Sequence, residues 1–533
     1  MLTPMILLIV APLLLLIVAP LLLLIVAPLL LFIWAASVIL KPGLTSVPGP
    51  WLAKISNLYR IRMVQRGRFS YELVELHRKY GPAVRIGPDC VSLTDRRLIK
   101  DIYGYRTDFI KSDWVKSSQT LYNGKVVPAL MTTQDKGYHA AMKRAIASAY
   151  SVTTLQGYET SVEDTVRLFL QKLDDLYAKR AKRVLSTNGF SSVSCIRLGQ
   201  EKTTNANESD AYDVIGAVTM SRSMGLLEQG TDVDNMLKEI QVEAEYRAVG
   251  AVMPLIDYVY RKNGLVTMFA APTYKIMIRA RRMLHERLQD RTKEKHPGTL
   301  NDRNMMGFVG SNLQAGSDTT AIVLRTILYH ALKTPEIVTR MQNELDAPGV
   351  THPISFQQAF NELPYVNGVI QEAIRIFPPF ALLLERMVPA LGLELPDGTV
   401  LPENTKVGMF EYTMHLDKEI YGSDAEKFNP ERWIRRAGED EVRFKERYEL
   451  MKASDMSFGH GQRRCVGVHV AELQIYKLIP ALIGLLDIEL ENPEEEWQIK
   501  QKFFALQSNI NVKIKWREGK SLGNFAKAEK KTG

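Results

Sequence analysis

The stretch that decides the fold of this chain is Phe458–Gly467, FGHGQRRCVG. Three glycines surround one cysteine, and glycine permits positive φ and close backbone approach, so such a loop can bring its amides near a sulfur atom and a flat ligand. Amide hydrogen bonds to a thiolate tune the metal that it binds. Arg463, two residues before Cys465, is suited to an anionic group on the same ligand. Any two of these residues alone would fit a simple glycine-rich turn around a buried cysteine.

The composition is that of a globular protein rather than a disordered chain. The 533 residues are 46% hydrophobic and 24% charged, with 68 Lys and Arg against 59 Asp and Glu. This length indicates either two or three ordinary domains or one large enzyme domain. The three cysteines, Cys90, Cys195 and Cys465, lie too far apart in sequence for a local zinc or iron–sulfur cluster, and they are too few for a disulfide framework. The sequence contains no Walker loop, no Rossmann glycine fingerprint and no HExxH motif.

The N-terminus reads as a membrane anchor. No charged residue occurs before Lys41, and the apolar run of residues 5–40 is longer than the run of about 18 that marks a membrane helix. A secretory signal would have a shorter apolar stretch after a basic start. The octad LLLLIVAP recurs within this run, which we interpret as duplication with no separate role. Because the positive charges follow the apolar run, we expect the body of the protein to face the cytosol.

The rest of the chain predicts a mainly helical body. Apolar residues at helical spacing predict helices over the following ranges: 66–80, 136–149, 155–180, 268–288, 305–332, 364–377 and 466–485. We expect a further helix to begin at Pro335 with Thr334 as its N-cap. Short strands are expected at 84–86, at 91–93 and within 387–411, and a surface loop at 186–210. The polar residues after Trp516 are expected to fray.

Two helices carry polar patterns that need an explanation. Residues 315–320, AGSDTT, place a glycine midway along a long helix, which costs about 1 kcal/mol relative to alanine. Thr319 can hydrogen-bond a carbonyl of the preceding turn or a water and so open a groove there. Glu372 and Arg375 lie three residues apart on one face of another helix, where they can pair. Each pattern alone is weak evidence for function.

Taken together, these motifs resemble the cytochrome P450 family. FGHGQRRCVG is similar to the family's F-G-x-G-x-R-x-C-x-G signature, AGSDTT to its A-G-x-D-T segment, Glu372 and Arg375 to its E-x-x-R, and FNPERW at 428–433 to its P-E-R-[FW] element. The matches follow the family's order along roughly residues 45–515. The resemblance implies a mainly α fold with small β-sheets, preceded here by a transmembrane helix.

The resemblance also implies roles for individual residues. Cys465 would be the axial thiolate of haem b, which favours O–O cleavage, with Phe458 packed near the sulfur. Asp318 and Thr319 would relay protons to dioxygen. The cofactor's carboxylates would be bound by Arg463, by Arg386, and by His139 and Lys143, which stand where many members have W-x-x-x-R; Arg144 is an alternative to Lys143. The family's buried triad would be Glu372, Arg375 and Arg432, and residues 380–384 would face the substrate.

The expected protein is a haem-thiolate monooxygenase that inserts one oxygen atom from O2 into a small apolar organic substrate. We expect four segments along the chain: an anchor at 1–40, a Pro/Gly-rich linker at 41–51, a haem domain at 52–516 and a basic tail at 517–533. The linker would be a stiff, extended spacer. The stretches 84–88 and 109–112, with His139, look like filamentous-fungal members of the pisatin-demethylase-like type, which often act in secondary metabolism. Residues 186–275 carry no recognisable motif, so the substrate is not readable.

The resemblance implies partners as well. Electrons would come from NADPH through a separate NADPH–cytochrome P450 reductase, with cytochrome b5 as a further candidate donor, at the endoplasmic reticulum membrane. A basic surface that includes Arg463 and Arg464 would suit an acidic redox partner. We expect contact with membrane lipid and no nucleic-acid partner. Two alternatives stay open: an isomerase or dehydratase of the same fold that needs no reductase, and a non-catalytic haem-binding protein.

Overall fold

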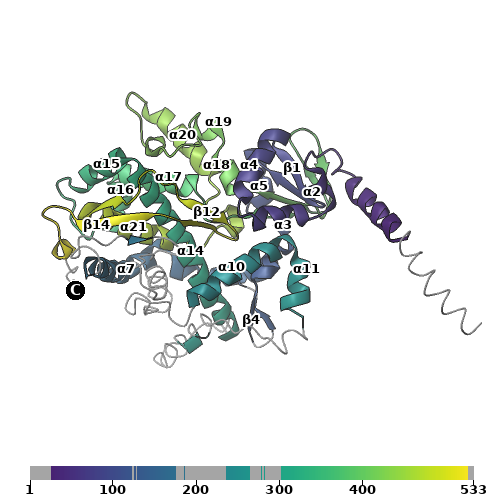
Figure 1. The fold of residues 1–533 in the computed structure, drawn as a ribbon, viewed down its shortest axis with the longest axis horizontal. Helices are drawn as coiled ribbons and strands as arrows, with labels where there is room; N and C mark the ends of the chain where they lie inside the picture. The colour runs from purple at the N-terminus through teal and green to yellow at the C-terminus, as the bar shows by residue number, and fades with distance from the viewer. Residues whose placement is uncertain are drawn as a thin grey trace, which may run out of the picture.

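The structure, a computed structural model, describes residues 26–122, 125–127, 129–175, 185–186, 236–263, 278, 281–282 and 302–525. Helices dominate, and the body has a larger helical part around α14 and a smaller part with a sheet next to the N-terminus (Figure 1). The helices are α2 (Trp51–Ile55), α3 (Leu58–Gln65), α4 (Phe69–Tyr80), α5 (Ile99–Tyr103), α6 (Lys136–Ile146), α7 (Val152–Leu173), α10 (Met236–Val252), α11 (Pro254–Ile256), α14 (Asp302–Lys333), α15 (Pro335–Leu345), α16 (Phe356–Asn361), α17 (Pro364–Ile376), α18 (Glu411–His415), α19 (Lys418–Tyr421), α20 (Glu441–Ser454) and α21 (Val468–Leu485).

The strands form small sheets. The largest has the order β1-β2-β10-β7-β3, in which only β2 and β10 run parallel. A second sheet has the order β11-β14-β6, and three hairpins pair β4 with β5, β8 with β9 and β12 with β13. The strands are β1 (Ala83–Gly87), β2 (Cys90–Leu93), β3 (Ile110–Lys111), β4 (Thr120–Tyr122), β5 (Lys125–Val127), β6 (Leu185–Ser186), β7 (Arg386–Met387), β8 (Leu393–Glu394), β9 (Val400–Leu401), β10 (Lys406–Met409), β11 (Leu486–Leu490), β12 (Gln498–Gln501), β13 (Ala505–Ser508) and β14 (Asn511–Trp516).

The predicted helices are confirmed where the structure describes them, with shifts at their ends. Helix α4 begins at Phe69 rather than at residue 66, because Gly67 has a φ of +67°, outside the helical region. Helix α6 ends at Ile146 and continues to Tyr150 as a 3₁₀ turn. Helix α15 begins at Pro335 as predicted, but the side chain of Thr334 makes no capping hydrogen bond. The predicted helix 268–288 and loop 186–210 lie almost entirely outside the described residues.

The main core lies between α14, α17 and α21, whose apolar side chains form one large buried cluster. Helix α21 is the only described helix long and apolar enough to cross a membrane, but 83% of its apolar window is buried inside the body. It is therefore a core helix. The core fixes α14 and α17 relative to the loop that precedes α21, and this loop carries Cys465.

An apolar helix, Val26–Ile39, projects from the body at the N-terminus (Figure 1). Its side chains are largely exposed, and Phe32 reaches 72%. Arg85 of β1 is fully buried and holds the helix end: its Nη2 donates to the carbonyls of Val38 (2.7 Å) and Pro88 (2.6 Å), and its Nη1 to Ile39 (3.3 Å) and Leu44 (3.2 Å). The helix end is thus bonded to the sheet. Residues 1–25 of the predicted anchor lie outside the described residues.

The linker after this helix is folded onto the body, which corrects the expectation of an extended spacer. Leu44 and Val47 are buried, and the N–H of Arg85 donates to the carbonyl of Pro48 at 2.7 Å. Gly49 lies so close to the Arg85 carbonyl that an added Cβ would be 2.2 Å from its oxygen. Burial of two apolar side chains holds the linker in place.

The first residues after Trp516 are ordered, contrary to the expected fraying. Arg517 Nη1 donates to the carbonyl of Gly484 at 2.8 Å, and Lys520 pairs with Asp346 at 3.1 Å. A 3₁₀ turn at Leu522–Asn524 follows, and Phe525 is buried in the main core. These bonds attach the start of the tail to α15 and α21. Residues 526–533 lie outside the described residues.

Candidate cofactor site

The cysteine loop has the tight backbone that its glycines predict. Gly459 and Gly461 have φ values of +68° and +60°, and a Cβ on Gly461 would lie 2.0 Å from the carbonyl oxygen of Tyr103. The N–H of Cys465 donates to the carbonyl of Phe458 at 2.8 Å and closes the loop. Only glycine fits position 461, because any other side chain would collide with α5.

Cys465 is an exposed residue of the loop, and its thiol lies close to the backbone N–H of Gly467. Burial raises its pKa, while the backbone N–H of Gly467 and the charge of Arg464 lower it. The Gly467 amide is therefore placed to stabilise a thiolate. The other described cysteine, Cys90, is fully buried, and burial raises its pKa to about 12. A buried thiol with such a high pKa is inert, so Cys90 is a core residue. Cys465, which is exposed, is the one of the two that can bind a metal.

His415 links the cysteine loop to α17. Its Nδ1 lies 3.0 Å from the carbonyl oxygen of Arg375, and its Nε2 accepts a hydrogen bond of 3.0 Å from the N–H of Met456. The ring is fully buried. Because Met456 stands two residues before Phe458, this histidine positions the start of the cysteine loop against the core helix.

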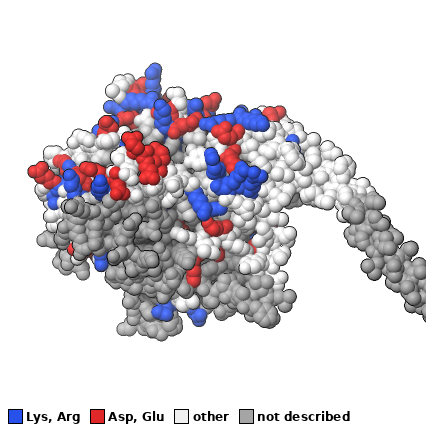
Figure 2. All heavy atoms as spheres, in the orientation of Figure 1, with Lys and Arg blue, Asp and Glu red and all other residues white. Residues whose placement is uncertain are grey.

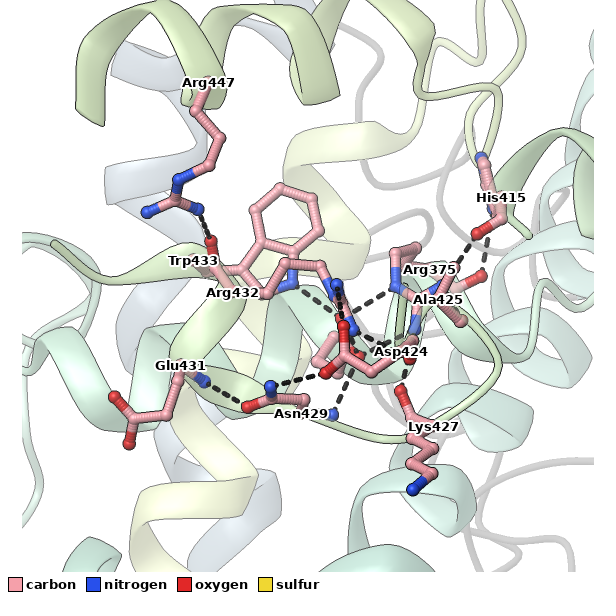
Figure 3. Close-up of polar contacts among 11 residues, drawn as sticks. Arg375, His415, Asp424, Ala425, Lys427, Asn429, Glu431, Arg432, Trp433 and Arg447 are labelled. Atoms are coloured by element: carbon pink, nitrogen blue, oxygen red, sulfur yellow. Dashed lines mark hydrogen bonds and ion pairs between the residues drawn. The ribbon is translucent and has the colours of Figure 1, made fainter. Parts of the chain in front are cut away.

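Figure 3 shows a set of polar contacts in which Arg375, Asp424 and Arg432 lie close together. Arg375 makes two hydrogen bonds to the Glu372 carboxylate, of 2.7 and 2.8 Å, and Trp433 Nε1 donates to it at 2.9 Å. Arg432 lies 3.4 Å from Glu372 and pairs with Asp424 at 2.9 Å. The predicted triad is therefore brought together, with Asp424 as an additional acid.

This cluster is electrically balanced. Two carboxylates, from Glu372 and Asp424, face two guanidinium groups, and Arg375 also donates to the carbonyls of His415 and Ala425 at 2.7 and 2.8 Å. Glu372, Arg375 and Arg432 are each at most 2% exposed. Buried charges persist when they are paired and hydrogen-bonded in this way. We call this set the neutral cluster: Glu372, Arg375, Asp424 and Arg432.

A second set of buried or half-buried basic residues lies beside the cysteine loop. It comprises Lys111, His139, Lys143, Arg386 and Arg463, and we call it the cationic cluster. Lys111 and Arg386 stand directly opposite each other on β3 and β7. Arg463 donates to the carbonyl of Thr133 at 3.2 Å, and Lys143 to that of Gln462 at 3.0 Å. His139 and Lys143 lie one turn apart on α6.

The cationic cluster has no carboxylate partner among the residues that the structure describes. Burial lowers the pKa of Arg463 to about 10, the charge of Arg386 adds to this, and the charge of the Asp135 carboxylate, which makes no ion pair with Arg463, opposes it. Burial and the charges of Arg386 and Arg463 hold the pKa of Lys111 well below its usual value. Burial also lowers the pKa of His139 to about 3, and its buried Nδ1 has no hydrogen-bond partner in the described chain.

Buried cations that repel one another fit an anionic ligand. A planar cofactor with two carboxylates, bound above Cys465, would supply the missing negative charge, so these residues fit haem. On α6, Lys143 faces the cysteine loop, whereas Arg144 is exposed. The structure thus brings together the predicted residues Cys465, Arg463, Arg386, His139 and Lys143, the last in preference to Arg144.

Asp318 and Thr319, the residues predicted to relay protons to dioxygen, lie midway along α14. The Thr319 hydroxyl donates to the carbonyl of Ala315 at 2.7 Å, which is one of the two hydrogen bonds that the sequence allowed. Asp318 is 1% exposed, while Ala315 is exposed and Thr319 is half-buried. The helix nevertheless stays continuous from Asp302 to Lys333, so the hydrogen bond does not break it.

The predicted substrate segment 380–384 is apolar and largely buried. Ala381, Leu382 and Leu383 are at most 4% exposed, and Phe380 packs against Trp114 and Phe503 with ring centroids 5.6 and 5.2 Å apart. Only Glu385 separates the segment from Arg386. The apolar segment is therefore close in sequence to the cationic cluster.

Sequence reasoning missed three residues of this region: Lys111, His415 and Asp424. None lies in one of the short motifs, and each reaches the site by a contact with a distant segment. The like-charged pairing of Lys111 with Arg386 depends on two strands of two residues each, which have no periodicity to detect. Lys111 stood within a stretch that the family resemblance had singled out, and this was the one available signal.

The comparisons with known proteins agree with this geometry. The family model described as Cytochrome P450 matches residues 47–516. Cytochrome P450 monooxygenase vrtE of Penicillium aethiopicum is 35% identical over 512 residues, which cover 91% of this chain and 92% of that protein. Cytochrome P450 monooxygenase cicH of Emericella nidulans is 32% identical, with 89% and 94% covered, and cfoH of Aspergillus candidus is 31% identical, with 88% of each chain covered. The chain therefore belongs to the cytochrome P450 family and is a monooxygenase of that family.

Proposed function

We propose that this chain is a haem-thiolate monooxygenase in which Cys465 ligates the iron. The observation that carries the proposal is the combination of an exposed free thiol beside the Gly467 amide with a cationic cluster that has no carboxylate partner among the described residues. The family membership implies haem iron as the cofactor. When bound, a thiolate-ligated haem supplies the activation of dioxygen.

The protein's own residues would divide the work of binding. Cys465 would hold the iron, Phe458 would pack near the sulfur, and Arg463, Arg386, His139 and Lys143 would bind the two carboxylates. The Gly467 N–H would limit the charge on the thiolate and so tune the iron. The neutral cluster would not touch the cofactor. It would hold the cysteine loop in place through His415.

Proton delivery would fall to Thr319 and Asp318. The Thr319 hydroxyl proton is directed at the Ala315 carbonyl, which fixes the rotamer and leaves the hydroxyl oxygen able to accept a second hydrogen bond. Asp318, the buried residue that precedes Thr319 in α14, would relay protons to it. Both residues would be expected in an oxygen-using enzyme rather than in an isomerase or dehydratase of the same fold.

The substrate would be a small apolar organic molecule, oxidised by hydroxylation, epoxidation or oxidative demethylation. The apolar segment 380–384 supports this, because it would line the space beside the bound cofactor. We place the enzyme in fungal secondary metabolism, as a member of the pisatin-demethylase-like type. Support comes from the fungal relatives and from the stretches 84–88 and 109–112.

Electrons would come from NADPH through the separate reductase, with cytochrome b5 as a second donor. The structure changes the surface expected for this partner: Arg463 turns inward to the carbonyls of residues 133–135, so only Arg464 of the pair is exposed. On the face drawn in Figure 2, acidic and basic side chains intermingle. Around α20 they pair, as Arg447 does with Glu439 at 2.8 Å.

The exposed apolar helix Val26–Ile39 would anchor the protein in the endoplasmic reticulum membrane, with the body in the cytosol. Its exposed side chains, such as Leu31 at 62% and Phe32 at 72%, are costly in water and favourable in lipid. Flotation of the full chain with lipid vesicles, compared with a chain lacking residues 1–40, tests this attachment. Equal flotation of the two forms would contradict it.

Cys465→Ala tests the ligand assignment. We expect the dithionite-reduced wild type to show the red-shifted Soret band of thiolate-bound haem under carbon monoxide, and the variant to lose it. Cys90→Ala is the matched control, because Cys90 is also a free cysteine but lies in the core. A variant that lacks Cys465 and keeps the band would refute the proposed ligand.

Thr319→Ala tests the proton relay. We expect the haem content to be unchanged. The share of NADPH electrons that ends in hydrogen peroxide should rise several times, because proton delivery is no longer directed. Thr326→Ala is the matched control, since Thr326 makes the same type of hydrogen bond, to Ile322 at 2.8 Å, two turns further along α14. Unchanged coupling in Thr319→Ala would remove this residue from the relay. Turnover without NADPH would instead favour an isomerase or dehydratase.

A further inference from the structure

One polar side chain on α14 lies in line with Thr319. Asn312 stands seven residues before Thr319, and seven residues make almost two full turns of an α-helix. Ala315 and Gly316 lie between them on the same face. Ala315 is exposed, and Asn312, Gly316 and Thr319 are partly exposed. Neighbours on the other faces are buried: Leu313, Ser317, Asp318 and Thr320. Asn312 therefore belongs to the open face of α14 that carries Thr319.

The carboxamide of Asn312 is held by a tyrosine from another segment. Asn312 Nδ2 donates to the hydroxyl oxygen of Tyr150, which ends the 3₁₀ turn after α6. The Tyr150 ring packs edge-on against Phe308, one turn before Asn312 on α14, with ring centroids 6.2 Å apart. Tyr150 thus contacts α14 at two successive turns, and these contacts fix the orientation of the Asn312 side chain.

Tyr150 lies on the side of the molecule that holds the proposed cofactor site. Burial raises the pKa of Tyr150, the hydrogen bond from Asn312 lowers it, and the charge of Cys465 raises it further. Tyr150 is therefore a neutral phenol within electrostatic reach of the proposed iron ligand. The segment that it ends begins in α6, which carries His139 and Lys143 of the cationic cluster. The Tyr150–Asn312 contact thus stands beside the cofactor site.

The Asn312 carboxamide has an acceptor that the described chain does not use. An amide oxygen can accept two hydrogen bonds, but within the residues that the structure describes the Asn312 side chain bonds only to Tyr150, through Nδ2. Asparagine is also less favourable than alanine in a helix interior, so its place midway along α14 calls for a compensating contact. A partly buried amide oxygen loses hydrogen-bond energy unless a donor from outside the chain reaches it.

We propose that Asn312 is a specificity-determining residue whose Oδ1 accepts a hydrogen bond from a hydroxyl group of the substrate, and that Tyr150 is the positioning residue that holds the carboxamide. The rise of an α-helix places Asn312 about 10 Å from Thr319 along the helix axis. Ala315 and Gly316, which are small, leave room between them for an apolar skeleton. The substrate would therefore be an apolar molecule that carries a hydroxyl group about 10 Å from the oxidised carbon. The inference rests on the proposed function, to which it adds this one polar group.

Discrimination between two ligands separates this role from a merely structural one. If the contact only tied α14 to the turn after α6, its loss would weaken the binding of every ligand alike, whereas a hydrogen bond to a hydroxyl group affects only the ligand that carries one. The probes are N-octylimidazole and its ω-hydroxy derivative, because an imidazole nitrogen that binds haem iron shifts the Soret band and so reports Kd without turnover. The butyl and dodecyl pairs vary the reach of the hydroxyl group.

We expect the wild type to prefer the ω-hydroxy compound by about tenfold in Kd at one chain length. Asn312→Leu should abolish this preference and leave the Kd of the unsubstituted compound close to the wild-type value. Tyr150→Phe removes the hydroxyl group that holds the carboxamide and should leave a preference of about threefold. Ser311→Ala, at a polar neighbour on another face of α14, is the control and should keep the full preference. Asn312→Ala, a change that favours the helix, replaces Asn312→Leu should that variant not fold.

Each result decides a separate part of the proposal. A wild type without a preference at any chain length, or an Asn312→Leu or Asn312→Ala variant that keeps the preference, would overturn the role of Asn312. A Tyr150→Phe variant with the full preference would overturn the positioning role of Tyr150. If the wild type showed neither a Soret shift with the imidazoles nor a thiolate-type spectrum with carbon monoxide, the proposed haem site itself would fail, and this inference with it.

Discussion

The neutral cluster and the cationic cluster are both buried and rich in arginine, yet they are built in opposite ways. In the neutral cluster, Glu372 and Asp424 face Arg375 and Arg432 within hydrogen-bond distance. In the cationic cluster, the hydrogen bonds that Arg386 and Arg463 donate within the described part of the chain all go to backbone carbonyls. Both sets are buried and both connect to the cysteine loop, the neutral cluster through His415 and the cationic cluster through Lys143, so burial alone does not distinguish them.

The difference teaches how to separate a buried charge that supports the fold from one that binds a ligand. Charges that are balanced within the protein stabilise the chain only as long as every partner is present. Charges without a partner cost stability until a ligand arrives, and they mark a binding site. In the protein without cofactor, removing one charge should therefore lower the free energy of unfolding in the neutral cluster. In the cationic cluster the same kind of change should raise it or leave it unchanged.

The largest expected effect is in the neutral cluster. Glu372→Gln would leave two buried guanidinium groups without their shared carboxylate, and we expect a loss of about 3–5 kcal/mol in the free energy of unfolding. Thermal unfolding and the yield of folded protein measure this. Glu431→Gln is the control: Glu431 lies on the same segment, but its pair with Arg340 is about half exposed and should contribute less than about 1 kcal/mol. Equal effects of the two substitutions would erase the distinction.

A smaller effect of opposite sign is expected in the cationic cluster. Arg463→Met removes a cation that Arg386 repels, so the haem-extracted protein should be as stable as the wild type or slightly more stable, while haem transfer to apomyoglobin should be about tenfold faster. Arg464→Met, at the exposed neighbour, should change neither quantity. Strong destabilisation of the haem-extracted Arg463→Met protein would show that this arginine supports the fold after all.

The smallest effect concerns pH. Burial, with the charges of Arg463, Lys111 and Lys143, lowers the pKa of His139 to about 3 from an ordinary value of 6.5. As the pH falls below 6.5, the unfolded chain takes up a proton that the folded chain does not, so stability is lost between pH 6.5 and 3. In haem-extracted protein, His139→Gln should reduce the loss between pH 7 and 5 by about 1 kcal/mol, measured by urea unfolding. An unchanged loss in His139→Gln would show that this histidine does not cause the pH dependence.

Much of this site could be predicted from the sequence, because its chemistry is concentrated in short motifs. Cys465 and Arg463 lie within ten residues, and Glu372 and Arg375 lie on one turn of one helix. The local rules of glycine loops and helical spacing are enough to recognise such sets. The long core helices were predictable for the same reason, since their apolar periodicity extends over many turns.

The rest depended on contacts between distant segments. Lys111 reaches the site through a two-residue strand, Asp424 through a loop, and His415 through a short helix, and none of these elements is long enough to show a period. The linker after residue 40 was expected to be extended because of its prolines. Instead, Leu44 and Val47 pack into a buried apolar cluster of the body. Burial against distant residues overrides such local preferences.

Arg85 has a consequence for any shortened form of this enzyme. Two of its four carbonyl acceptors, those of Val38 and Ile39, belong to the apolar helix, and a chain begun after residue 40 to improve solubility would lose them. The buried guanidinium of Arg85 in β1 would then need water in place of these two acceptors, and the linker at 41–51 should become less firmly attached to the body. A start site at or before Val38 would keep all four acceptors, so a soluble version is better begun there, or made by replacing the exposed apolar side chains of that helix, than begun after residue 40.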